Sequence, residues 1–153
     1  MAKKFKFKLQ SVLDIKIKNE DDEKRKLADV MQLQAREEQI LAQMHQKQIR
    51  LTAELKEKQG TGGINITELQ IYSHGIERVK KDIISQQIRL REIAIMLEDQ
   101  RRKLIEATQE KKIYEKLKEN QHKAYIEEEE FAERLLIDEL ATLKYAKVKK
   151  DDD

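Results

Sequence analysis

Two short groups of residues have types and spacings that support chemistry in other proteins. The first is Glu119-x-x-His122, in which a carboxylate and an imidazole share one face of a helix. It is half of the motif of di-iron helix bundles, which need a second copy and two further glutamates. The chain has 3 histidines and no second Glu-x-x-His. The ligand count therefore argues against a metal site.

The second group is Gly60-Thr61-Gly62-Gly63, which has the glycine content of a phosphate-binding loop. Such a loop follows a strand and continues into Gly-Lys-Ser/Thr, and neither feature is present here. Glycines 60, 62 and 63 instead predict a turn. Because the chain also has no cysteine and no spacing that suggests a Ser/His/Asp set, we expect neither an enzyme nor a bound cofactor.

The composition is typical of long helices. Of 153 residues, 41% are charged and 5% aromatic, and proline is absent, which favours a coiled coil over a globule. Disorder is the competing interpretation, but the net charge is only +2 and the apolar residues recur in phase. The balance of 32 basic and 30 acidic residues argues against nucleic acid as a partner. No apolar run approaches the roughly 20 residues that span a bilayer, so we expect a cytosolic protein.

The periodicity predicts an all-α fold: one long antiparallel two-helix coiled-coil hairpin over residues 1–153, with helix two extending beyond helix one. Helix one is expected over about residues 9–58 and helix two over about 65–148, with the turn at 60–63 between them. Asn65 is the expected cap of helix two. Alternating steps of three and four then define a seam. Its members are Leu69, Tyr72, Ile76, Val79, Ile83, Gln86, Leu90, Ile93, Leu97, Gln100, Leu104 and Ala107.

Gln86 and Gln100 are the polar members of this seam. Polar core residues usually specify pairing at some cost in stability, and we favour that role for both. The alternative is that they mark where a partner meets the seam.

A turn centred near residue 62 predicts which residues of the two helices lie opposite each other. Leu41 is expected near Ile83, Leu27 near Leu97, and Leu13 near Lys111. Helix one then ends opposite about residue 118, which leaves roughly the last 30 residues of helix two without an internal partner. Phe5 and Phe7 are expected to pack on Ile113, Tyr114 and Leu117, where the short helix begins.

The N-terminal residues Phe5-Lys6-Phe7-Lys8-Leu9-Gln10-Ser11-Val12-Leu13 resemble the F-x-F-x-L-Q-x-V-L start of the FliJ family of flagellar export proteins. Length, the absence of cysteine, the off-centre glycine turn and the Leu/Ile ladder agree with this resemblance over the whole chain. The resemblance implies a coiled-coil hairpin similar to the stalk (gamma) subunit of rotary ATP synthases. It also implies a non-enzymatic component of the flagellar type III export machinery.

Family members sit in the ring of the export ATPase and link it to the membrane-embedded export gate FlhA, and some also escort export chaperones. The resemblance thus implies a cytoplasmic protein held at the inner face of the membrane through its partners. Matched by register, the residues that contact the gate are Tyr72, Ile76, Val79 and Ile83. By analogy with the rotary stalk, the candidate ATPase contacts are Phe5, Phe7, Tyr125, Phe131, Leu135, Leu136, Leu140 and Leu143. The alternative function is a generic helical-hairpin chaperone or adaptor unrelated to export.

Overall fold

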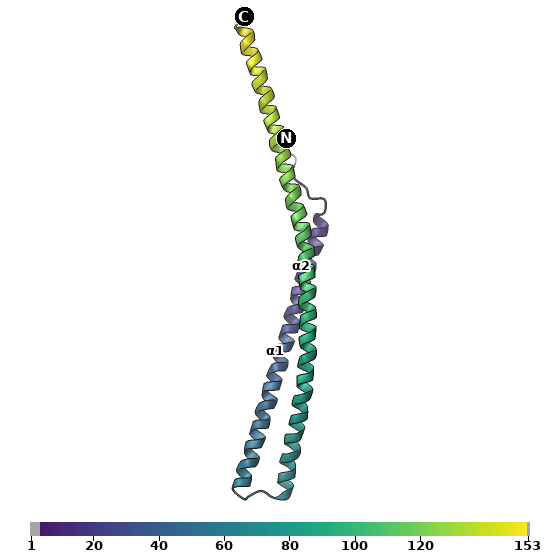
Figure 1. Ribbon diagram of the computed structural model, residues 1–153, viewed down its shortest axis with the longest axis vertical. Coiled ribbons are helices and arrows are strands. Elements are labelled where there is room, and N and C mark those ends of the chain that lie inside the picture. Colours follow the sequence, from purple (N-terminus) through teal and green to yellow (C-terminus); the bar gives the residue numbers. More distant parts are fainter. Residues whose placement is uncertain (1–3, 153) are drawn as a thin grey trace. The chain divides into compact units, whose positions relative to one another are not determined.

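The computed structural model describes residues 4–152, and these form two helices joined by a short connection (Figure 1). Helix α1 covers Gln10–Gly60 and helix α2 covers Ile66–Asp151. The predicted all-α fold with a longer second helix is confirmed, and both helix ranges lie within three residues of the prediction at each end.

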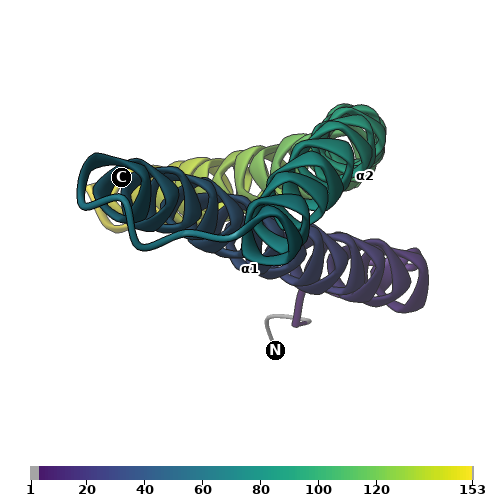
Figure 2. The same cartoon turned by 90° about the horizontal axis from the view of Figure 1, so that it is seen from below.

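Local sequence explains where the helices stop and start. The positive φ of Gly62, 67°, is the only one in the described residues, so the turn depends on this glycine. Gly60, predicted to lie in the turn, is instead the last residue of α1. The backbone N–H of Glu68 donates to the Asn65 side-chain oxygen at 2.8 Å, which confirms Asn65 as the cap of α2. Figure 2 shows the connection from the turn end.

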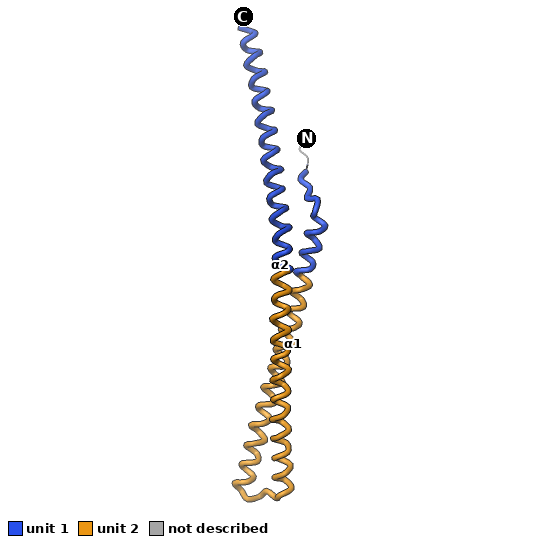
Figure 3. The backbone as a smooth tube through the Cα atoms, turned by 45° about the vertical axis from the view of Figure 1, so that its right-hand side comes forward, with its two compact units in different colours: residues 1–20, 107–153 blue, residues 21–106 orange. Residues whose placement is uncertain are grey.

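Contacts divide the chain into two compact units, and both helices pass through both units (Figure 3). One unit holds residues 21–106, which we call the shaft. The other holds residues 1–20 and 107–153, of which 4–20 and 107–152 are described. Each unit has its own pairing between α1 and α2.

The shaft is held by the predicted seam. The buried residues that α2 contributes to it are Val79, Ile83, Gln86, Ile93, Leu97 and Gln100, and all six stand at predicted seam positions. Gln86 contacts Glu37 and Gln100 contacts Glu23, each within one residue of the partner expected from the turn. The seam and its register are therefore confirmed in the shaft.

In the second unit two lysine side chains contact other residues than those predicted to lie opposite them. Lys111 was expected opposite Leu13 but bonds to Glu20, and Lys118 bonds to Gln10. Leu13 lies instead in a groove with Lys118. Lys16 pairs with Glu110, which the turn places opposite residue 14, so this contact lies within two residues of the predicted pairing. Lysine side chains that reach along the helix link α1 to α2 here, beside the buried Phe7 and Leu13.

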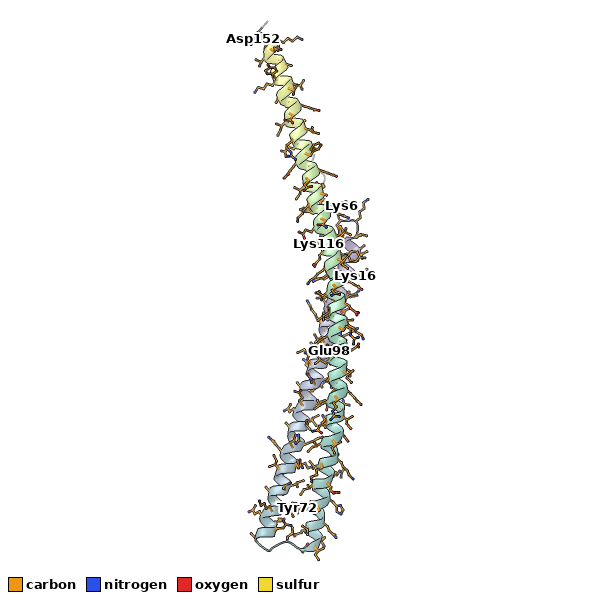
Figure 4. All side chains as sticks on the ribbon, in the orientation of Figure 1. Lys6, Lys16, Tyr72, Glu98, Lys116 and Asp152 are labelled. Carbon is orange, nitrogen blue, oxygen red and sulfur yellow. The ribbon has the colours of Figure 1, made fainter. Side chains whose placement is uncertain are left out.

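Beyond Tyr125, α2 has no described partner within its unit. Every residue from 126 to 150 is exposed, and we call this stretch the overhang. Figure 4 shows its side chains projecting around a single helix. Tyr125 was expected to belong to it, but Phe5 covers Tyr125, so the uncovered stretch begins one residue later.

Candidate binding surfaces

The two glutamines of the seam are occupied by α1. Gln86 Nε2 donates to the Glu37 backbone carbonyl at 3.0 Å and to the Glu37 carboxylate. Gln100 Nε2 donates in the same way to the Glu23 carbonyl, at 3.2 Å, and to the Glu23 carboxylate. Because both amides are bound within the hairpin, they set the register of the shaft.

The Glu37 carboxylate has two partners on α2 in the shaft. Besides Gln86, it accepts an ion-pair contact from Arg89 Nε at 3.0 Å. The Gln86 hydrogen bond, aided by the Arg89 charge, lowers the pKa of Glu37 below its ordinary value. The carboxylate is therefore held in its charged form inside the seam.

The candidate gate residues divide into two pairs. Tyr72 and Ile76 are half-buried, and the Tyr72 hydroxyl donates to Glu54 at 3.3 Å (Figure 4 labels Tyr72). Lys58 Nζ lies 5.0 Å from the centre of the Tyr72 ring, within cation–π range. Val79 and Ile83 are only 4% and 7% exposed, because they pack into the seam. Only the first pair can touch a partner while the helices stay together.

A shallow groove adjoins these residues near the turn. Leu51 lines it from α1, and Tyr72, Gly75 and Val79 line it from α2. The groove therefore connects the exposed side of Tyr72 with the edge of the seam at Val79.

The N-terminal segment packs further along α2 than expected. The Phe5 ring lies edge-on to His122 with centroids 5.0 Å apart, and 5.7 Å from Tyr125. Phe7 is buried at 8% exposure. The expected neighbours were Ile113, Tyr114 and Leu117, and of these Ile113 is 65% exposed. The ring of Phe5 thus lies one to two helical turns beyond the expected position on α2.

Lysine side chains tie α1 to α2 in this unit. Lys111 Nζ lies 3.0 Å from Glu20, which is 3% exposed, and Lys16 Nζ lies 2.9 Å from Glu110. The hydrogen bond to Glu20 raises the pKa of Lys111, and that to Glu110 raises the pKa of Lys16. Lys118 Nζ donates to the Gln10 side-chain oxygen at 2.7 Å. Sequence reasoning missed Glu20, although it lies seven residues from both Leu13 and Leu27 and so holds their heptad position.

The overhang carries the largest set of exposed apolar side chains without a neighbouring helix. The predicted ATPase contacts within it are between 49% and 67% exposed: Phe131, Leu135, Leu136, Leu140 and Leu143. Ile137, Tyr145 and Val148 are exposed as well and were not predicted. Contiguous exposed apolar surface of this kind marks an interaction site.

The half-motif Glu119-x-x-His122 has structural roles. Glu119 forms an ion pair with Lys123 at 3.2 Å, and the ring of His122 packs edge-on against the ring of Phe5. Among the described residues no group of three or more potential metal ligands gathers. In the same part of the chain neither helix has a segment apolar enough to cross a membrane.

Comparison with known families adds the decisive observation. The family model of the flagellar FliJ protein matches residues 5–150, nearly the whole chain. The chain belongs to the FliJ family. Comparisons with curated proteins and with solved structures give no match. Membership in the FliJ family makes the hairpin a component of flagellar protein export, and its exposed surfaces are the places to look for partners.

Proposed function

We propose that the chain is a stalk-like adaptor that binds the flagellar export ATPase through its overhang and couples it to the export gate FlhA. The observation that carries this proposal is that every residue from 126 to 150 is exposed. A single helix with this many large apolar side chains is expected to bury them against another protein. In this role the hairpin supplies a helical arm and no chemistry, and works in the cytoplasm at the inner face of the membrane.

The ATPase contact is proposed to involve Phe131, Leu135, Leu136, Leu140 and Leu143. Burying a large apolar side chain contributes about 1.5–3 kcal/mol before ordering costs, so a few of them suffice for specific binding. A supporting role is proposed for three residues at the base of the overhang: Phe5, Phe7 and Tyr125. Phe7 is buried and Phe5 packs on Tyr125, which supports a role in holding the base of the overhang.

The gate contact is proposed to lie at Tyr72 and Ile76, which are partly exposed beside the groove near the turn. Val79 and Ile83 contribute by keeping that stretch of α2 against α1. The carboxylate and ammonium beside the Tyr72 ring, from Glu54 and Lys58, give the surface polar anchors as well. Binding of export chaperones is a further part of the proposal, on the family relationship alone.

Truncation tests the ATPase contact. A chain that ends after Tyr125 keeps the Phe5 packing and removes the overhang. We expect it to remain helical, to lose co-purification with the export ATPase and to lose stimulation of ATP hydrolysis. Unchanged co-purification would refute the role of the overhang.

Substitution tests the gate contact. We expect Tyr72→Ala with Ile76→Ala to weaken binding to FlhA while the helical content stays unchanged. Tyr72→Phe is the matched control, since it keeps the ring and removes only the hydroxyl that bonds to Glu54. Equal affinity in the double variant and the wild type would contradict the contact.

A further inference from the structure

One stripe of the overhang has a distinctive order of residue types. Positions 129, 133, 136, 140, 143 and 147 follow steps of four and three, the spacing of a coiled-coil seam. The residues are Glu129, Glu133, Leu136, Leu140, Leu143 and Lys147. The stripe is thus acidic at its start, apolar in the middle and basic at its end.

The spacing of this stripe is also symmetric. Residues 129 and 147, 133 and 143, and 136 and 140 are each equally far from residue 138. Two copies of the stripe aligned antiparallel about residue 138 therefore place seam position against seam position along their whole length. Leu136 of each copy meets Leu140 of the other, and Glu129 meets Lys147.

We propose that the overhang pairs with the overhang of a second copy of this chain, in an antiparallel two-helix coiled coil centred on residue 138. Charge complementarity specifies this occupant, because opposite charges meet at both ends of the pair. Lys144, next to Leu143 in sequence, adds a second cation within reach of Glu133 of the other copy. A parallel pair would bring Glu129 against Glu129 and Lys147 against Lys147, which is unfavourable.

The surface needed for this pairing is open in the described structure. The three leucines of the stripe are 57%, 58% and 67% exposed. Glu129 accepts a hydrogen bond of 2.8 Å from Tyr125 within the same helix and remains exposed. The paired span of residues 126–150 starts after Tyr125, which contacts Phe5, and the described part of the N-terminal segment leaves all of it exposed.

The pairing goes beyond the proposed function and does not depend on it. Because it covers Leu136, Leu140 and Leu143, which also belong to the proposed ATPase contact, the two complexes exclude each other. Self-pairing then shields the apolar face of the free protein. Its test uses the full chain alone, so a failure here says nothing against ATPase binding.

Charge reversal tests the pairing by sedimentation. We expect the wild type to form dimers as concentration rises. Glu129→Lys with Glu133→Lys makes the stripe basic at both ends, and Lys144→Glu with Lys147→Glu makes it acidic at both ends. Each variant alone should dimerise about tenfold more weakly or worse, and an equimolar mixture should recover dimers. Glu128→Lys with Asp138→Lys is the matched control, since it changes the net charge as the first variant does but both residues lie on the side of the helix away from the stripe.

Cysteine crosslinking tests the orientation, because the natural chain contains no cysteine. Glu129→Cys and Lys147→Cys lie about 27 Å apart along one helix. In an antiparallel pair neither variant crosslinks to itself, whereas a mixture of the two forms a disulfide. A wild type that stays monomeric at every concentration would overturn the proposal, and so would self-crosslinking of either single variant. Equal weakening by the off-stripe control would overturn it too.

Discussion

The shaft and the overhang use the same helix, α2, in opposite ways. In the shaft, Leu97 is 6% exposed and lies in a seam with α1. In the overhang, Leu136 is 57% exposed on a helix without a described neighbour in its unit. The residue type is the same in both regions. What differs is whether α1 supplies the other half of the seam.

The polar groups of the two regions differ in the same sense. In the shaft, Gln86 and Gln100 are satisfied by Glu37 and Glu23 of α1. In the overhang, the charged residues are exposed, and apart from Arg134 the acidic ones precede the basic ones along the helix. The shaft is therefore complete in one chain, whereas the overhang has the composition of half an interface. Substitutions in the shaft should therefore lower the free energy of unfolding, whereas substitutions in the overhang should weaken binding to a partner protein.

The largest difference between the two regions is expected when a large apolar side chain is replaced by alanine and the free energy of unfolding is measured. Ile93→Ala in the shaft removes a side chain that is 3% exposed and should cost about 2–4 kcal/mol in the free energy of unfolding. Leu136→Ala in the overhang should change it by less than about 0.5 kcal/mol. Urea unfolding followed by circular dichroism, at a concentration where the protein is monomeric, measures both. Equal losses would break the distinction.

Replacing a polar residue of the seam should lower the free energy of unfolding by a smaller amount. Gln86→Ala leaves the Glu37 carboxylate and carbonyl without the amide, and should cost about 1–3 kcal/mol. The neighbouring Gln87 is exposed, so Gln87→Ala is the matched control and should be nearly neutral. Thermal unfolding of the two variants gives the comparison. If both shift the midpoint alike, Gln86 does not fix the register.

Acid should weaken the shaft through Glu37. Its pKa is lowered in the folded protein, so its contribution is fully present above the ordinary value of 4.5 and is lost as the pH falls through the folded-state value. Wild type should therefore exceed Glu37→Gln in stability at neutral pH, and the difference should shrink in acid. Unfolding curves at several pH values test this, with Glu38→Gln at the neighbouring exposed position as control. A difference that persists in acid would contradict the assignment.

Two glycines near the turn should respond with opposite signs and the smallest magnitudes. A Cβ at Gly75 would lie 3.8 Å from Leu51 Cδ1, an ordinary contact, so Gly75→Ala should stabilise the helix by about 0.5–1 kcal/mol. Gly62 has a φ of 67°, so Gly62→Ala should destabilise the turn by about 1 kcal/mol. Thermal midpoints measure both. Shifts of the same sign would show that the turn does not need a left-handed residue.

The sequence was sufficient to predict the helices, the cap and the shaft. The seam repeats without interruption from Leu69 to Ala107, and one clear break fixes the turn. The partners of Lys111 and Lys118 in the second unit were not predictable from the turn, because both lysines bond through flexible side chains that reach along the helix. Apolar periodicity contains no information on such reach.

The glutamates of α1 were missed for a related reason. Glu23 and Glu37 share a heptad position with Val30, Met44 and Leu51, so the spacing already placed them at the seam. A search for apolar residues passes over them. Gln86 and Gln100 stand at seam positions of α2, and polar residues at the facing positions of α1 were the partners to look for. The overhang itself was predicted from the unequal helix lengths, but its start was placed too early because Phe5 reaches Tyr125.

The affinity for the purified export ATPase tests the central claim most directly, through matched pairs of substitutions in the two regions. Leu136→Ser with Leu143→Ser changes side chains that are 57% and 67% exposed in the overhang. Ile88→Ser with Ile95→Ser changes side chains that are 49% and 71% exposed on the shaft. We predict that the overhang variant binds about tenfold more weakly or worse, while the shaft variant binds like the wild type. Undiminished binding by the overhang variant, or equal losses in both, would contradict the claim.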